Sequence, residues 1–158
     1  MGGSEERKRI ASNRRARHEY EILDTLEAGI ALRGPEVKSL RAGRANLSDA
    51  YAILRGGEVF LRNLHISPYQ EAGRENSDPT RERKLLLHRQ EIHRLRSKVA
   101  ERGLTLIALS LYWKDGRAKV ELAVARGRRR YDKREAIRRR EQDREAQRAS
   151  RQRGRRGG

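Results

Sequence analysis

The sequence predicts a mainly β protein: an OB-like antiparallel β-barrel with two or three flanking helices and a basic C-terminal tail that folds on binding. Apolar and polar residues alternate in several short stretches, which is the pattern of half-buried strands. Glycine-containing turns join these stretches as hairpins, and hairpins favour an antiparallel sheet. Nearly all Leu, Ile and Val lie between residues 18 and 125, so one domain holds the core. Among small barrels, the OB-like fold is a common binder of nucleic acid.

The first predicted elements are a strand and a short helix. Residues 18–33 carry apolar side chains at even spacing, which predicts extended backbone. Pro35 suits the first turn of a helix, Glu36 complements the positive end of the helix dipole, and Gly43 can end the helix. We therefore expect a strand followed by a short helix.

Four further strands are expected in two hairpins: residues 50–54 with 59–64, and residues 104–113 with 120–124. Gly56-Gly57 permits the positive φ angles of a two-residue turn in the first hairpin. Residues 114–117 turn the chain in the second. Both hairpins pair neighbouring segments, as an antiparallel barrel requires.

A long helix is expected between the hairpins, after a polar loop at residues 69–77. Asp78-Pro79 reads as an N-cap with proline in the first turn, and Gly103 reads as the stop after about Arg102. Residues in steps of three and four, mostly apolar, form one face, namely Leu85, His88, Ile92, Leu95 and Val99. The arginines of this segment are expected on its solvated face: Arg81, Arg83, Arg94 and Arg102.

The charge is concentrated at the two ends of the chain. Of a formal net charge of +17, residues 126–158 carry +10 and the first seventeen residues carry +4. Such segments cannot bury enough apolar surface to fold alone, and a polyanion would release counterions on binding them. We therefore divide the chain into a disordered basic N-terminus (1–12), the barrel (13–126) and the tail (127–158).

The tail has a helix signal of its own. Asp132 stands three residues before Glu135 as a reciprocal cap, and the segment to about Arg148 has good helix propensity. Ile137 is its only large apolar residue, so the helix should be marginal in water and form where a surface takes up its charge.

Catalytic and metal-binding patterns are missing from the sequence. The chain has no cysteine, His88 and His93 are five residues apart, and the acids of the barrel are not clustered. We expect no metal, no cofactor and no enzyme activity, although a metal-dependent nuclease is a rival. No apolar run is long enough to cross a membrane, so the expected location is cytoplasmic.

Four residues stand out as candidate RNA contacts. Arg14, Arg15 and Arg17 are clustered and lead directly into the first predicted strand, which would hold them against the barrel. Glu27 lies in a predicted turn at residues 26–29. It is either a turn acid or an acceptor for base N–H groups and ribose 2′-OH groups.

Several ordered motifs resemble those of one family. They are NRRARHEY at residues 13–20, EAGI at 27–30, EVKSLRAG at 36–43, DAY at 49–51, DPTR at 78–81, RKLLL at 83–87, LSLYWK at 109–114 and GRRRYDKRE at 127–135. In this order they resemble the SsrA-binding protein family, small protein B (SmpB), from about residue 13 to 145.

The resemblance implies an OB-like barrel that binds the tRNA-like domain of transfer-messenger RNA (tmRNA), as a monomer in a 1:1 complex. Alanyl-tRNA synthetase and elongation factor Tu would be indirect partners, and the RNA would tag the nascent chains of stalled ribosomes. The RNA-binding positions it implies are Asn13, Arg14, Arg15, Arg17, Tyr20, Glu27, Lys38, Arg41 and Leu86. The rival is a ribosomal protein or assembly factor with a basic extension.

For the tail, the resemblance implies a helix in the empty mRNA channel and decoding centre of the small subunit, in place of codon–anticodon pairing. The implied contacts with ribosomal RNA are Gly127, Arg128, Arg129, Tyr131, Asp132, Lys133, Arg134 and Arg138. Arg128 and Arg129 replace the usual lysines, which makes bidentate phosphate contacts possible. Tyr131 stands where some members carry histidine, and it either stacks on a decoding base or makes a helix-end contact.

Overall fold

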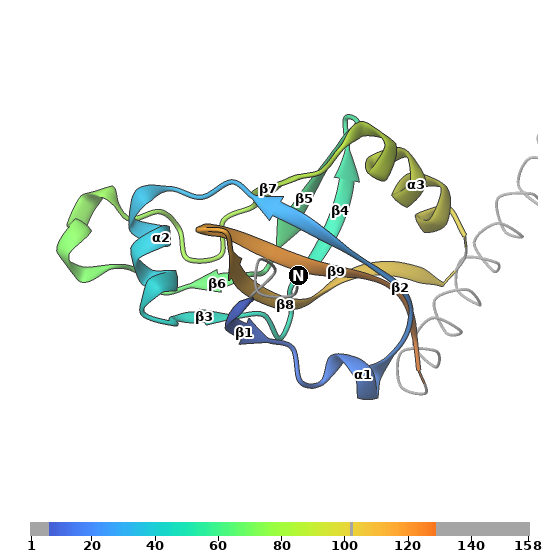
Figure 1. Ribbon diagram of the computed structural model, residues 1–158, viewed down its shortest axis with the longest axis horizontal. Coiled ribbons are helices and arrows are strands. Elements are labelled where there is room, and N and C mark those ends of the chain that lie inside the picture. The colour runs from blue at the N-terminus through green and yellow to red at the C-terminus, as the bar shows by residue number, and fades with distance from the viewer. Residues whose placement is uncertain (1–6, 102, 129–158) are drawn as a thin grey trace, which may run out of the picture.

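The computed structural model describes residues 7–101 and 103–128 (Figure 1). In chain order the elements are β1 (Lys8–Ser12), α1 (Ala16–Glu19), β2 (Tyr20–Ile30), α2 (Gly34–Arg41), β3 (Ala45–Asn46), β4 (Tyr51–Arg55), β5 (Glu58–Arg62), β6 (His65–Ile66), the 3-10 helix η2 (Gln70–Glu75), β7 (Arg83–Leu86), α3 (Arg89–Val99), β8 (Leu104–Lys114) and β9 (Arg117–Gly127).

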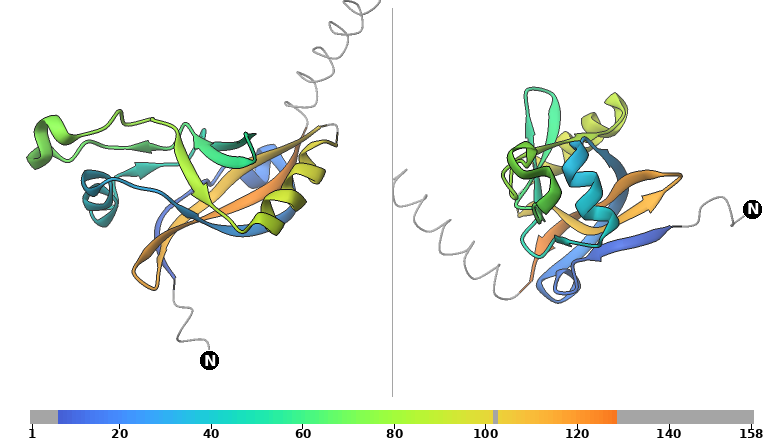
Figure 2. Two further views of the ribbon diagram at one scale, coloured as in Figure 1. Left: turned by 90° about the horizontal axis from the view of Figure 1, so that it is seen from above. Right: turned by 90° about the vertical axis from the view of Figure 1, so that its left-hand side faces the viewer.

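Six antiparallel strands close into a barrel. Their order is β8-β4-β5-β7-β2-β9, and β9 pairs back onto β8 to complete the ring. β1 pairs with the same edge of β8 as β4 does, but along a different stretch of that strand (Figure 2). The pairing confirms the predicted OB-like antiparallel barrel.

Alternate residues of the strands fill the barrel. Leu61, Leu85, Leu111 and Val120 are fully or almost fully buried in one core cluster. The predicted hairpins form, with positive φ angles at Gly56 and Gly57 in the first and at Asp115 and Gly116 in the second. These turns bring the core-facing positions of their strands into register.

The long helix expected from Asp78 to Arg102 is wrong. Its first part is strand β7, and only Arg89–Val99 is helical, as α3. β7 lies between β5 and β2, where Leu85 is opposite both Val59 and Ile30. Burial alternates along β7, because Arg83 and Leu85 face inward while Lys84 and Leu86 face outward. The barrel closes only when this segment is a strand. Its pairing with the neighbouring strands therefore overrides the helix-like spacing of its apolar residues.

Other boundaries also differ from the sequence predictions. Residues 8–12 are not disordered: they form β1 on the edge of β8. Arg14 and Arg15 precede the one-turn helix α1 and not a strand directly. Residues 26–29 form no turn, because they lie within β2.

Of the arginines expected in solvent, Arg83 is buried and Arg81 is partly buried. The Arg83 side chain is fully buried, and its Nε donates to the Glu36 carboxylate at 2.6 Å. Arg81 donates to both oxygens of the same carboxylate, at 2.6 and 3.1 Å. Arg83 also donates to the carbonyls of Leu64 and Pro79. Glu36 therefore joins α2 to the segment that enters β7, which its position in a first helical turn did not indicate.

The helices lie at opposite ends of the barrel. α2, β3, β6 and η2 gather at one end, and α3 covers the other (Figures 1 and 2). Asp24 of β2 accepts hydrogen bonds from Arg94 and Lys98 and so ties α3 to the barrel. None of the helices in the described part of the chain is long and apolar enough to cross a membrane.

Candidate nucleic-acid interface

Glu27 lies on the outer face of the barrel, in the middle of β2. The Tyr112 hydroxyl donates to its Oε2 at 2.5 Å, and the Lys114 ammonium lies 3.4 Å from both carboxylate oxygens. Arg7 is 3.7 Å from the same carboxylate, and its guanidinium lies 4.7 Å from the centre of the Tyr112 ring. These contacts leave the Glu27 side chain 28% exposed, so the carboxylate is oriented and still accessible.

This environment keeps Glu27 ionised. Burial by itself raises the pKa of Glu27, but the Tyr112 hydroxyl and the cations of Lys114 and Arg7 outweigh burial and hold that pKa below its ordinary value. Burial and the bond to Glu27 raise the pKa of Tyr112, which keeps its proton and remains the donor. At neutral pH the site presents a fixed anion that can accept hydrogen bonds among cations.

Leu86 lines the same surface as Glu27. Both residues border an open groove of about 990 Å³ whose apolar wall includes Ile92 and Trp113. Leu86 is 53% exposed, which is unusual for a large apolar side chain in a barrel strand. It lies opposite Gly29 of β2, where an added Cβ would come within 3.1 Å of the Leu86 Cβ. The glycine thus makes room for Leu86 on this surface.

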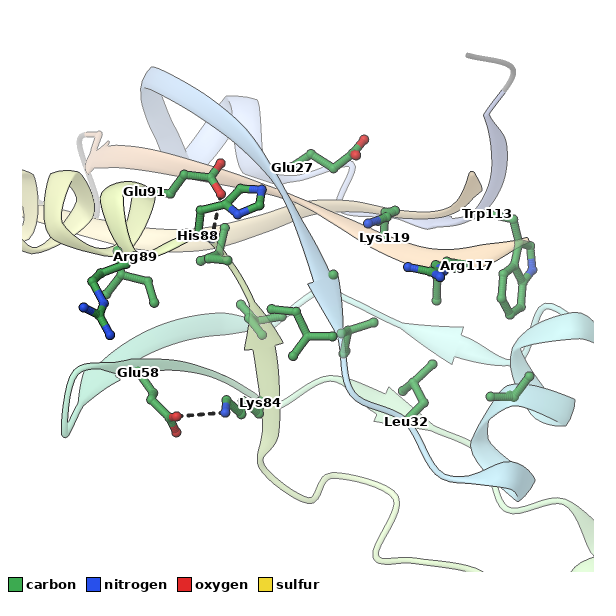
Figure 3. A pocket seen from close by; sticks show the side chains of 18 of the residues that line it. Glu27, Leu32, Glu58, Lys84, His88, Arg89, Glu91, Trp113, Arg117 and Lys119 are labelled. Carbon is green, nitrogen blue, oxygen red and sulfur yellow. Dashed lines mark hydrogen bonds and ion pairs between the residues drawn. The ribbon is translucent and has the colours of Figure 1, made fainter. Parts of the chain in front are cut away.

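Cations border the groove on both sides. Lys84 pairs with Glu58 at 2.8 Å on one side, and Arg117 and Lys119 of β9 lie on the other (Figure 3). The apolar wall offers a surface for flat bases, and the cations beside it, interspersed with Glu27, Glu58 and Glu91, offer partners for a charged backbone. The groove therefore offers both kinds of contact that an RNA strand uses.

Arg14 and Arg15, which precede α1, and Arg17 within it form a second basic surface and are called the α1 arginines below. Ala16 is buried against Ile107 and Leu109, which fixes the helix on the outside of the barrel. Arg14, Arg15 and Arg17 are therefore exposed, and none of them forms an ion pair within residues 7–101 and 103–128. Their separation from carboxylates leaves their charge available for phosphates.

Asn13 fixes the position of this surface by hydrogen bonds to the barrel. Its side-chain amide donates to the carbonyls of Ala108 and Ser48 at 3.3 and 3.5 Å, and its backbone N–H donates to Leu109 at 2.8 Å. Ala108 adjoins a bulge in β8. Asn13 therefore holds the turn that presents Arg14 and Arg15.

The described part of the tail begins beside α1. Tyr20 is opposite Gly127, the last residue of β9. The Arg128 backbone N–H donates to the Glu19 carbonyl at 2.7 Å, and its guanidinium donates to the Tyr20 carbonyl at 3.1 Å. The basic tail thus leaves the barrel next to the α1 arginines. The other predicted tail contacts lie outside the described residues: Arg129, Tyr131, Asp132, Lys133, Arg134 and Arg138.

Lys38 and Arg41 lie on α2, at the far end of the barrel. Lys38 is 5.4 Å from the centre of the Tyr69 ring, a cation–π contact. Arg41 is exposed in the last turn and lines a small hollow beside β1. The structure therefore groups the predicted RNA contacts at three places: Glu27 with Leu86, the α1 region, and α2.

The comparisons identify the family. The SmpB protein family matches residues 10–152. The chain belongs to the SmpB family. It is 56% identical to an SsrA-binding protein of Desulforudis audaxviator, over 93% of this chain and 96% of that one. It is 60% identical to an SsrA-binding protein of Acidothermus cellulolyticus, over 90% of each chain. A solved structure described as "tmRNA-SmpB: a journey to the center of the bacterial ribosome" is 53% identical, with a TM-score of 0.64, and the match covers 81% of this chain and 94% of that chain.

Sequence reasoning missed part of the site of this SmpB-family chain. Tyr112 and Lys114 are 85 and 87 residues from Glu27, and Arg7 was assigned to a disordered end. Tyr112 and Lys114 do alternate along β8, which places them on one face. Within the described residues, no three His, Asp or Glu side chains are placed to hold a metal ion.

Proposed function

We propose that the protein is a tmRNA-binding adaptor for trans-translation, acting in the cytoplasm without catalysing a reaction. The observation that carries the proposal is the sequence match, which extends at 56–60% identity over nine-tenths or more of the chain. The geometry supports it, since the unpaired α1 arginines and the ionised Glu27 offer the two kinds of group that RNA recognition needs.

The two parts of the chain have separate roles in this proposal. The barrel binds the tRNA-like domain through the α1 arginines, Glu27, Leu86 and the cations of α2. The tail, from Gly127 on, enters the empty mRNA channel and contacts ribosomal RNA at the decoding centre. One protein binds one RNA. Alanyl-tRNA synthetase and elongation factor Tu join the complex through the RNA.

Crosslinking in cells, followed by sequencing of the attached RNA, tests this function. We expect tmRNA to be the dominant partner, with small-subunit ribosomal RNA crosslinked through the tail. A ribosomal protein or assembly factor would crosslink to ribosomal RNA in every ribosome and show no preference for tmRNA. Cleavage of RNA by the purified protein with magnesium, lost on a single acid substitution, would instead indicate a nuclease.

Two substitutions separate the roles of the charged residues. Arg14→Ala is expected to reduce the slope of log affinity against log salt by about 0.7–0.9, because one phosphate contact is lost. Glu27→Ala should weaken binding without reducing that slope, since it removes an acceptor and leaves Lys114 and Arg7 in place. Filter binding to the tRNA-like domain over a salt series measures both. Parallel lines for the wild type and both variants would contradict the assignment.

A further inference from the structure

A second hollow shares Trp113 and Gly116 with the groove. Its volume is about 370 Å³, and it is lined by β1, the end of α2 and the hairpin between β8 and β9. β1 contributes Lys8, and α2 contributes Arg41, whereas the next residue after Lys8, Arg9, lies opposite Tyr112 and so faces the other side of β1. The pairing of β1 with β8 places Lys8 opposite Trp113, so their side chains are neighbours on one face. Three segments that are distant in sequence thus meet at this hollow.

The cations of this hollow are not neutralised. Lys8 and Arg41 are exposed, and neither forms an ion pair in the part of the chain that the structure describes. By contrast, nearby Arg7 and Lys114 are both paired with Glu27. A concave surface lined by charge of one sign raises the local concentration of the opposite ion. The hollow therefore selects an anionic ligand.

Trp113 gives the hollow a second kind of contact. It is the only Trp of the chain, and it packs on the barrel core while remaining partly exposed. It lies at the end of the groove nearest α2 (Figure 3). An indole presents a flat surface on which any nucleobase can stack. A free phosphate ion would contact the cations but would not contact the indole ring.

We propose that the hollow binds one unpaired nucleotide of the RNA, with its base stacked on Trp113 and its phosphate bound by Lys8 and Arg41. The inference rests on the proposed function, which supplies the RNA, and adds a contact to it. The groove beside Trp113 leads from this hollow to Glu27 and Leu86. A single-stranded loop lying across Trp113 can therefore reach both sites.

Fluorescence of the single Trp in the full chain tests the proposal. The tRNA-like domain of tmRNA is expected to quench it, whereas a blunt RNA duplex should not, because its bases are already stacked. The variant Lys8→Ala/Arg41→Ala should bind the tRNA-like domain about tenfold more weakly and lose the quenching. The matched control is Arg74→Ala/Arg96→Ala, which removes two exposed cations on η2 and α3 and should keep the quenching.

The outcomes separate this site from the function itself. Tight binding of the tRNA-like domain without quenching, or equal affinities for the two double variants, would contradict nucleotide binding in the hollow. Neither result would contradict the adaptor function. Equal quenching by the duplex would overturn base stacking on Trp113. Failure of the wild type to bind the tRNA-like domain at all would overturn both.

Discussion

Replacing Arg83 by Met is expected to lower the free energy of unfolding by about 3 kcal/mol, the typical cost of breaking a buried ion pair from one side. Arg83 is fully buried and donates to Glu36 and to the carbonyls of Leu64 and Pro79. Methionine fills similar volume but donates no hydrogen bond, so the carboxylate and both carbonyls lose a partner. Urea unfolding followed by circular dichroism measures the change.

Lys84→Met is the matched control for this prediction. Lys84 is the next residue of β7, points to the opposite face, and pairs with Glu58 where both side chains are nearly half exposed. Its loss should change stability by less than about 1 kcal/mol. A double variant, Glu36→Gln/Arg83→Met, should be less destabilised than the sum of the two single variants, because no buried charge is then left without its partner. Equal effects of Arg83→Met and Lys84→Met would show that the buried pair does not hold α2 to the barrel.

The same ion pair predicts how stability depends on pH. Burial alone would raise the pKa of Glu36, but hydrogen bonds from Arg81 and the Arg33 backbone, together with Arg83, hold it below the ordinary value of 4.5. A lowered pKa gives stability that is present above pH 4.5 and is lost as the pH falls through the folded-state value. Acid destabilisation should therefore be shallower in Glu36→Gln than in the wild type.

Neighbouring residues in the sequence were sufficient to predict the hairpins but not to predict strand β7. Gly56 and Gly57 both take the positive φ angles that a two-residue hairpin turn favours, so the strands on either side of it follow from neighbouring residues. Leu85 satisfies both a helical stripe and a strand alternation. Only its pairing with Val59 and Ile30 decides between them, and these residues are distant in sequence.

The same distinction holds for the site. Arg14, Arg15 and Arg17 were predicted as RNA contacts from their clustering in sequence, and this local clustering becomes clustering at a single turn of the surface. The environment of Glu27 could not be predicted, because Tyr112 reaches it only through the closure of the barrel. Glu36 illustrates the same limit: a first-turn acid is a sufficient local explanation, yet its partners come from the entry to β7.

Deleting residues 129–158 is expected to leave binding to the tRNA-like domain within about threefold and to abolish tagging on stalled ribosomes. The cut keeps β9 whole and retains Arg128, whose backbone N–H and guanidinium bond to α1 and β2. The deleted segment has thirteen Arg or Lys against five Asp or Glu, so the remaining chain keeps a net charge of +9 and its α1 arginines. Affinity for the tRNA-like domain and tagging of a nascent chain made from a message without a stop codon measure the two effects.

Ile137→Pro in the full chain separates the helix of the tail from its charge. The substitution keeps every cation, but proline inside a helix costs about 3 kcal/mol or more, and the tail sequence predicts a helix that is marginal in water. Tagging should fall nearly as far as it does in the truncated chain, while affinity for the tRNA-like domain stays at the wild-type level. Normal tagging by Ile137→Pro would mean that the charge of the tail suffices without its helix. Normal tagging by the truncated chain would remove the tail from the mechanism altogether.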